Sequence, residues 1–148
     1  ISAEAMKRGV SELEPYLAKT DIKSNGKVII ASVAGDVHDI GKNLVALMIQ
    51  SAGFGLEDMG VDVPTEKIVE AVKTSAPDVL ALSALLTTTR LEIPAIIEAL
   101  KSAGLREQVK VLVGGAPITN DFAQESGADG YAPDALQAAK AVQNLINA

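Results

Sequence analysis

Residues 27–52 read KVIIASVAGDVHDIGKNLVALMIQSA, an apolar run, a polar loop and a second apolar segment in succession. The first part, 27–33, is rich in β-branched side chains, which is typical of a strand buried in a parallel sheet. Residues 42–52 have the apolar spacing of a helix. The loop between them therefore follows the carboxyl end of a strand, where open α/β sheets bind their ligands.

The same alternation continues along the chain. Apolar runs predict strands at 54–59, 78–83, 109–113 and around 130–131, and helical spacing predicts helices at 65–75 and 91–103, a short helix capped by Thr119 and a final helix opened by Pro133. Five strands alternating with helices predict an α/β fold with a parallel, doubly wound sheet. We expect the flavodoxin-like order 2-1-3-4-5, a Rossmann-like arrangement whose switch point lies between strands one and three.

Residues 1–26 stand outside this alternation. Their apolar side chains recur at helical spacing, at Met6, Val10, Leu13 and Leu17, and predict a helix within 2–20 followed by a polar linker. This helix either packs on the sheet domain, 27–148, or is the last helix of a helical domain that is otherwise missing. A start without methionine fits the second interpretation.

Composition excludes several classes of function. The chain has 148 residues, of which 48% are hydrophobic, enough for one domain with an aliphatic core. A net charge of -6 argues against nucleic-acid or anionic-membrane partners, because no basic patch offsets the phosphate charge. No segment approaches the roughly 20 apolar residues that cross a bilayer. The absence of cysteine excludes disulfides and thiolate metal sites and fits a cytoplasmic protein.

His38 is the only histidine of the chain and the first candidate for chemistry. Asp36 can accept a hydrogen bond from one imidazole nitrogen, which fixes the tautomer and makes the other nitrogen a better metal ligand. A zinc site needs three or four protein ligands, which one histidine without cysteine does not supply. A macrocycle that brings its own equatorial ligands needs only one. Alternatively, His38 is a loop residue that caps the following helix.

Small and hydroxyl side chains follow the other strands. Gly41 lets a bulky group pass close to the backbone, and the helix behind it favours a phosphate. Residues 83–89 read SALLTTT, so hydroxyls follow the third strand, and Gly114 and Gly115 clear space after the fourth. An ordinary threonine-rich turn and a tight glycine turn are the plain alternatives.

Taken together, Asp36-x-His38-x-x-Gly41, Ser83-x-Leu85 and Gly114-Gly115 resemble the cobalamin-binding domain of corrinoid proteins. The resemblance covers about 27–147. The string GDVHDIGKN, residues 35–43, is similar to that of cobalamin-dependent methyltransferase modules, such as the cobalamin-binding module of methionine synthase. The resemblance implies that residues 1–26 are the remnant of an N-terminal helical cap domain plus a linker.

The resemblance also implies a role for individual residues. His38 is expected to be the lower axial ligand of cobalt and to displace the cofactor's own base, with Asp36 and Thr89 as a relay that takes up or releases a proton. Many relatives have serine where Thr89 stands. Ser83, Leu85, Gly114 and Gly115 are expected to line the slot for the displaced nucleotide tail, and Gly41 to pass its phosphate. Further expected corrinoid contacts are Val37, Asp39, Ile40, Thr87 and Tyr131.

The function that the resemblance implies is that of a methyl carrier, a non-catalytic subunit of a methyltransferase system in one-carbon metabolism. A methyl-donor:corrinoid methyltransferase would load cobalt with a methyl group from methanol, a methylamine or an aromatic methyl ether. An acceptor methyltransferase would pass it to a folate or thiol, and a reductive activator is a further possible partner. No nucleic acid and no membrane are expected.

Several alternatives stay open at this point. An adenosylcobalamin-dependent mutase subunit carries the same histidine motif, but such relatives usually have arginine where Ile40 stands. A cobalamin-binding sensor would reuse the same module. A phosphate-binding loop is disfavoured, because five residues separate Gly35 from Gly41 and Asn43 replaces the magnesium-binding hydroxyl. A phospho-accepting receiver domain needs an aspartate where Ser83 ends the third strand.

Overall fold

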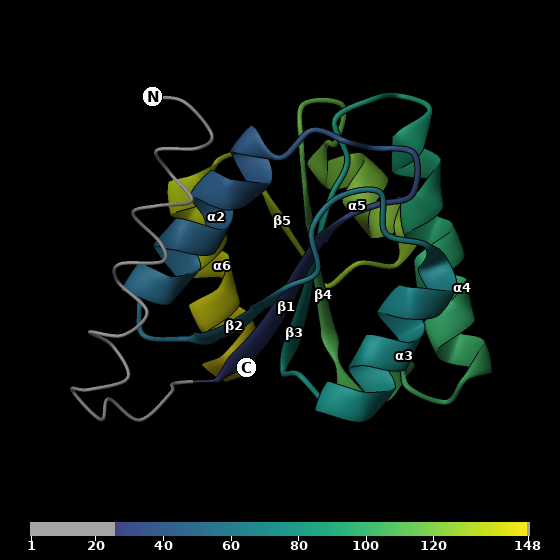
Figure 1. Ribbon diagram of the computed structural model, residues 1–148, viewed down its shortest axis with the longest axis horizontal. Helices are drawn as coiled ribbons and strands as arrows, with labels where there is room; N and C mark the ends of the chain where they lie inside the picture. Colours follow the sequence, from purple (N-terminus) through teal and green to yellow (C-terminus); the bar gives the residue numbers. More distant parts are fainter. Residues whose placement is uncertain (1–25, 148) are drawn as a thin grey trace.

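The computed structural model describes residues 26–147, which form an α/β fold around one parallel sheet (Figure 1). The strands are β1 (Lys27–Ser32), β2 (Gly55–Asp58), β3 (Val79–Ser83), β4 (Lys110–Gly114) and β5 (Gly130–Ala132). They lie in the order β2-β1-β3-β4-β5, and each neighbouring pair is parallel. The predicted fold class and strand order are confirmed. The helix and linker predicted within 1–26 lie outside the described residues, apart from Gly26.

Helices cover both faces of this sheet (Figure 1). They are α2 (Ile40–Ser51), α3 (Thr65–Ser75), α4 (Glu92–Ser102), α5 (Asn120–Ser126) and α6 (Ala135–Asn147), with single 3-10 turns at Thr89–Leu91 and Arg106–Gln108. α2 and α6 pack on one face, and α3, α4 and α5 on the other. Within residues 26–147, no helix combines the length and apolar character that a membrane crossing requires.

The alternation of strand side chains divides the core in two. Successive residues of a strand point to opposite faces of the sheet. On the face covered by α3 to α5, the buried strand residues are Ile29, Ala31, Leu80, Leu82, Val111 and Val113. On the face covered by α2 and α6, they are Val28, Ile30, Val79, Ala81, Leu112 and Ala132. On this second face, the next residues along β3 and β4 are the small Ser83 and Gly114 at the carboxyl ends of the strands, and they matter for the site.

Two predicted helix starts are wrong. α2 begins at Ile40 instead of residue 42, because the backbone N–H of Asn43 already donates to the carbonyl of Asp39 at 2.8 Å. Gly41 is therefore in the first helical turn. α6 begins after Asp134, whose carboxylate accepts from the backbone N–H of Gln137 at 2.8 Å, so Pro133 precedes the cap. The predicted cap at Thr119 is confirmed by a 3.0 Å bond from the N–H of Phe122.

Candidate functional site

The motifs named above meet at one edge of the sheet because their strands end level with one another. Ser32 of β1 pairs in register with Ser83 of β3, Ser83 with Gly114 of β4, and Gly114 with Ala132 of β5. The loops that leave these positions therefore start side by side. This is the edge at which doubly wound sheets bind ligands, and the switch point lies between β1 and β3 as predicted.

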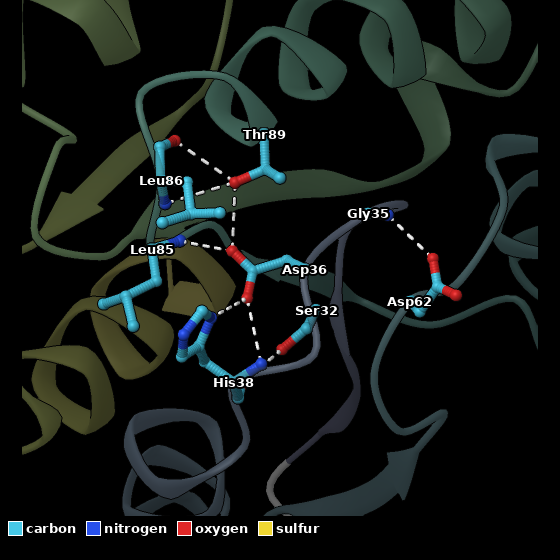
Figure 2. A network of polar contacts seen from close by, with 8 residues as sticks. All are labelled: Ser32, Gly35, Asp36, His38, Asp62, Leu85, Leu86 and Thr89. Atoms are coloured by element: carbon cyan, nitrogen blue, oxygen red, sulfur yellow. Dashed lines mark hydrogen bonds and ion pairs between the residues drawn. The ribbon is translucent and has the colours of Figure 1, made fainter.

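Asp36 is the centre of the polar network at this edge (Figure 2). Its side chain is only 1% exposed. Oδ1 accepts from Nδ1 and the backbone N–H of His38 at 3.0 and 3.1 Å. Oδ2 accepts from the backbone N–H of Leu85 at 2.5 Å and from Oγ1 of Thr89 at 3.0 Å. Four donors occupy the acceptor sites of an ionised carboxylate, so a negative charge is stabilised here without an ion pair to any lysine or arginine of residues 26–147.

These contacts set the pKa of Asp36. Burial raises the pKa, since it penalises the charged form, but the hydrogen bonds from Leu85, His38 and Thr89 together lower it further than burial raises it. The net result is a pKa below the ordinary value of 3.8. Asp36 is therefore a carboxylate at neutral pH.

The tautomer of neutral His38 follows from that charge. A carboxylate only accepts, so Nδ1 of His38 carries the proton that it donates to Asp36. Nε2 then has a free electron pair, and it makes no hydrogen bond to any residue of 26–147. The side chain is 48% exposed, so Nε2 is accessible from outside. An oriented, accessible imidazole with a carboxylate behind it has the arrangement of a metal-ligating histidine.

Thr89 is the third member of this network. Its side chain is buried, and its hydroxyl can donate to Asp36 or to the carbonyl of Leu86 at 3.1 Å. A charged acceptor forms the stronger bond, which favours donation to Asp36. The extra methyl group, Cγ2, lies against Gly35, where a Cβ would be 3.5 Å away. The site thus has room for the methyl group of threonine.

A groove of about 400 Å³ lies at the carboxyl ends of the strands, between the sheet and helices α2 and α6. Its floor is the face of the sheet that α2 and α6 cover. The strand residues there include Ala81, Ser83, Leu112 and Gly114. The side chains at the carboxyl ends are too small to fill the space under the two helices. Among the predicted residues, the groove is lined by Gly41, Ser83, Leu85, Gly114 and Gly115.

The three glycines serve different purposes. A Cβ on Gly41 would have nothing within 4 Å, so the missing side chain leaves open groove. A Cβ on Gly114 would lie 2.9 Å from the carbonyl oxygen of Ala132. A Cβ on Gly115 would lie 1.8 Å from the carbonyl oxygen of Ala84, and Gly115 has φ +132°. Gly115 is therefore required by the approach of the two loops themselves as well as by any ligand.

Exposed apolar side chains surround this edge. The large hydrophobic residues that the described part of the chain exposes all follow the carboxyl end of a strand, in a loop or an early turn of a helix: Val37, Ile40, Leu44, Leu85, Leu86, Leu91 and Leu136. Val37 and Ile40, two of the expected contacts, belong to this set, and Asp39 lies between them. An apolar rim around a single accessible imidazole suits a large, flat ligand with an apolar face.

Besides residues 36–40, which follow β1, two further predicted contacts do not line the groove. Thr87 is exposed and does not line it. Tyr131 packs against the core cluster on the opposite face of the sheet, because neighbouring residues of β5 alternate between faces. Tyr131 therefore lies on the face of the sheet away from the groove, and Thr87 lies in the exposed loop after β3.

Sequence reasoning missed two residues that shape the site. Ser32 is fully buried, and its hydroxyl donates to the carbonyl of His38 at 3.2 Å. Lys42 is 3% exposed; its ammonium donates to both carboxylate oxygens of Asp58, at 2.8 and 2.6 Å, and to the Asn43 side chain. This ion pair ties the first turn of α2 to the end of β2. Ser32 could have been noticed as a polar residue at the end of an apolar strand. Nothing in the sequence around Lys42 indicated that it would be buried and paired with Asp58.

Comparisons with known proteins agree with this geometry. The family model described as "B12 binding domain" matches residues 26–140. The trimethylamine corrinoid protein of Methanosarcina barkeri is 46% identical over 148 residues, a match that covers 99% of this chain and 68% of the relative.

Two solved structures are also similar. The monomethylamine corrinoid protein of Methanosarcina barkeri has a TM-score of 0.78 and 38% identity, and the match covers 95% of this chain and 67% of that one. A chain of the methanol:cobalamin methyltransferase complex from the same organism has a TM-score of 0.81 and 31% identity, over 99% of this chain and 55% of that one. The chain thus spans about two thirds of the length of the corrinoid relatives. It belongs to the B12 binding domain family and, within that family, to the corrinoid proteins.

Proposed function

We propose that the protein carries a methyl group on the cobalt of a bound corrinoid between two methyltransferases, with a methylamine as the methyl donor. The observation that carries this proposal is the accessible Nε2 of His38, backed by the ionised Asp36, at the edge of the sheet that also carries an apolar groove. The names of the trimethylamine and monomethylamine relatives support a methylamine rather than methanol or an aromatic ether.

The residues present fit the cofactor of the family. A corrinoid supplies its own equatorial nitrogen ligands, so the protein needs to offer one donor, and His38 is the one histidine available. The groove has the volume usual for a small-molecule site and is lined mainly by apolar and small residues. We propose that it holds the nucleotide tail once His38 has displaced the tail's base from cobalt. Gly41 would leave room for the phosphate at the start of α2.

When bound, the corrinoid supplies a cobalt centre that accepts and releases a methyl group. The chain would contribute one metal ligand, Nε2 of His38, and would hold the proton on Nδ1 of the same imidazole. Nε2 of His38 would hold the metal, and the hydrogen bond from Nδ1 to Asp36 would orient the imidazole and make Nε2 a better ligand. The carboxylate of Asp36 would hold the Nδ1 proton of His38 whether or not Nε2 binds the metal. Thr89 and the N–H of Leu85 keep Asp36 ionised throughout.

The partners follow from this role. We propose a methyl-donor:corrinoid methyltransferase that loads the carrier, an acceptor methyltransferase that unloads it, and a reductive activator that restores oxidised cobalt. The solved relative that belongs to a methanol:cobalamin methyltransferase complex supports such an assembly. We further propose that the protein works in the cytoplasm, where a reducing environment favours reduced cobalt.

The test is an anaerobic titration of the protein with methylcobalamin, followed by its visible spectrum, beside the variant His38→Ala. We expect stoichiometric binding in both. The wild-type spectrum should show coordination by imidazole, and His38→Ala should show the spectrum of cobalt without it. Cobinamide, which lacks the nucleotide tail, should bind more weakly than cobalamin. Identical spectra of wild type and His38→Ala would rule out His38 as the axial ligand.

A further inference from the structure

The loop that follows β2, residues 59–63, runs along the loop that follows β1. The N–H of Ser32 donates to the carbonyl of Gly60 at 3.0 Å, and the N–H of Val63 donates to that of Ser32 at 3.1 Å. Val33 and Val63 form an isolated parallel bridge. The two loops therefore continue the pairing of their strands beyond the end of the sheet. The loop that bears Asp36 is supported along one side by residues more than 20 positions away in sequence.

Asp62, near the end of the loop after β2, forms two hydrogen bonds with the loop after β1. Its carboxylate Oδ1 accepts from the backbone N–H of Gly35 at 2.7 Å (Figure 2). Its own N–H donates to the carbonyl of Asp36 at 2.8 Å. Asp62 adopts φ +50°, a left-handed conformation that aspartate and asparagine tolerate better than other residues with side chains. One residue thus holds two successive backbone groups, of Gly35 and Asp36.

The two hydrogen bonds of Asp62 hold the backbone of the loop, and those from Leu85 and Thr89 hold the Asp36 side chain. In Figure 2, Leu85 and Thr89 lie on one side of Asp36 and Asp62 on the other. Asp36 must reach Leu85 with one oxygen and His38 with the other, so its backbone has little freedom to move. A hydrogen bond to a charged acceptor, such as that from Gly35 to Asp62, is stronger than one between neutral groups. The loop is therefore held from both sides.

We propose that Asp62 is a positioning residue for the axial ligand. It fixes the turn at Gly35 and Asp36, and through Asp36 it sets the direction in which Nε2 of His38 points. The inference deepens the proposed function and rests on it for the role of His38. It predicts that Asp62, which has no place in the relay itself, controls how well His38 coordinates cobalt.

Three variants separate positioning from general stability. Asp62→Ala removes the acceptor for Gly35. Asp62→Asn keeps an amide oxygen that can accept, and tolerates φ +50°. The matched control is Asp78→Ala, because Asp78 is another exposed carboxylate that accepts from a backbone N–H, that of Lys27 at 2.9 Å, at the opposite end of the sheet.

The first measurement uses the protein without cofactor. NMR spectra should resolve the amides of Gly35 and Leu85, and the imidazole signals are unambiguous because His38 is the only histidine. Asp62→Ala should shift all three sets of signals, while Asp62→Asn and Asp78→Ala should leave those of Leu85 and His38 in place. If Asp62→Ala does not fold, Asp62→Gly removes the same acceptor without the left-handed strain and gives the same comparison.

The second measurement uses the protein loaded with cobalamin. The ratio of histidine-coordinated to uncoordinated cobalt in the visible spectrum should fall at least threefold in Asp62→Ala and return in Asp62→Asn. An Asp62→Ala protein with unchanged Leu85 and His38 signals and the wild-type ratio would overturn the inference. A wild-type spectrum without histidine coordination would instead defeat the proposed function, and the NMR comparison would still decide whether Asp62 positions Asp36 and His38.

Discussion

At position 36, a buried carboxylate stays ionised because four hydrogen bonds solvate it in place of water. Two of these donors, the N–H of Leu85 and the hydroxyl of Thr89, follow β3, and the other two belong to His38 in the loop after β1. The charge of Asp36 is therefore coupled to the position of both loops. A movement of the His38 imidazole would change its own hydrogen bond to Asp36 and, through the carboxylate, the other three hydrogen bonds. The network is therefore suited to an imidazole that binds a metal reversibly.

The low pKa of Asp36 predicts how stability depends on pH. Because the folded pKa lies below 3.8, the carboxylate stabilises the fold above that pH, and this stabilisation is lost as the pH falls through the folded pKa. Asp36→Asn should lower the free energy of unfolding at pH 7 by about 1–3 kcal/mol, since buried donors lose their acceptor. Urea unfolding from pH 7 to 3 should show the wild type and Asp36→Asn converging at low pH. Parallel curves would contradict the assigned charge.

At the scale of secondary structure, the site depends on where small residues end the strands and begin a helix. Ser83 and Gly114 leave space under α2 and α6 that larger side chains would fill. The ion pair of Lys42 with Asp58 holds the first turn of α2 in place beside that space. Gly115 cannot serve as a simple probe of the groove, since any side chain there would strike the backbone of Ala84.

Gly41 offers the cleaner test of the groove. A leucine there meets no atom within 4 Å at Cβ and replaces glycine in a helix, so the folded protein should be at least as stable. Its side chain would occupy the space proposed for the nucleotide tail. Gly41→Leu should weaken cobalamin binding by at least tenfold, about 1.4 kcal/mol, in an equilibrium titration. Ala95→Leu, on the exposed side of α4, is the matched control and should bind as wild type.

At the scale of the whole molecule, ligand binding and folding are coupled. The groove is lined by residues of α2, of α6 and of the strands. A ligand that fills it would therefore contact both helices and the sheet at once. An occupant of the groove should therefore stabilise the protein as a unit. The apolar rim at the same edge would gain contacts at the same time.

Thermal unfolding measures this coupling. Cobalamin at a concentration of 100 times its Kd should raise the free energy of unfolding by about 2.7 kcal/mol. For a protein of this size, each kcal/mol corresponds to about 2–4 °C in Tm. Cobinamide at the same concentration should give a smaller shift, because it leaves the groove unfilled. Equal shifts with the two compounds would argue that the tail binds elsewhere.

Local pattern was enough to predict most of the fold. Apolar runs such as 27–33 predicted the strands, and helical spacing such as that of 65–75 predicted the helices. The order of the strands was predicted from their number and from their alternation with helices. The meeting of Asp36, His38, Ser83, Leu85 and Gly114 also followed, because parallel strands end at one edge. The first turn of α2 was missed, since Gly41 disfavours a helix unless its surroundings hold one.

The sequence by itself therefore determined the class of fold, the edge that carries the site and the imidazole with its carboxylate, because these depend on residue types close together in the chain. Only the tertiary structure decided which distant groups complete them. Asp62 reaches Gly35, Lys42 reaches Asp58, and Leu85 donates to Asp36 across separations that no local pattern encodes. The physical reason is that strand register and loop pairing, rather than spacing along the chain, set those contacts, and with them the groove.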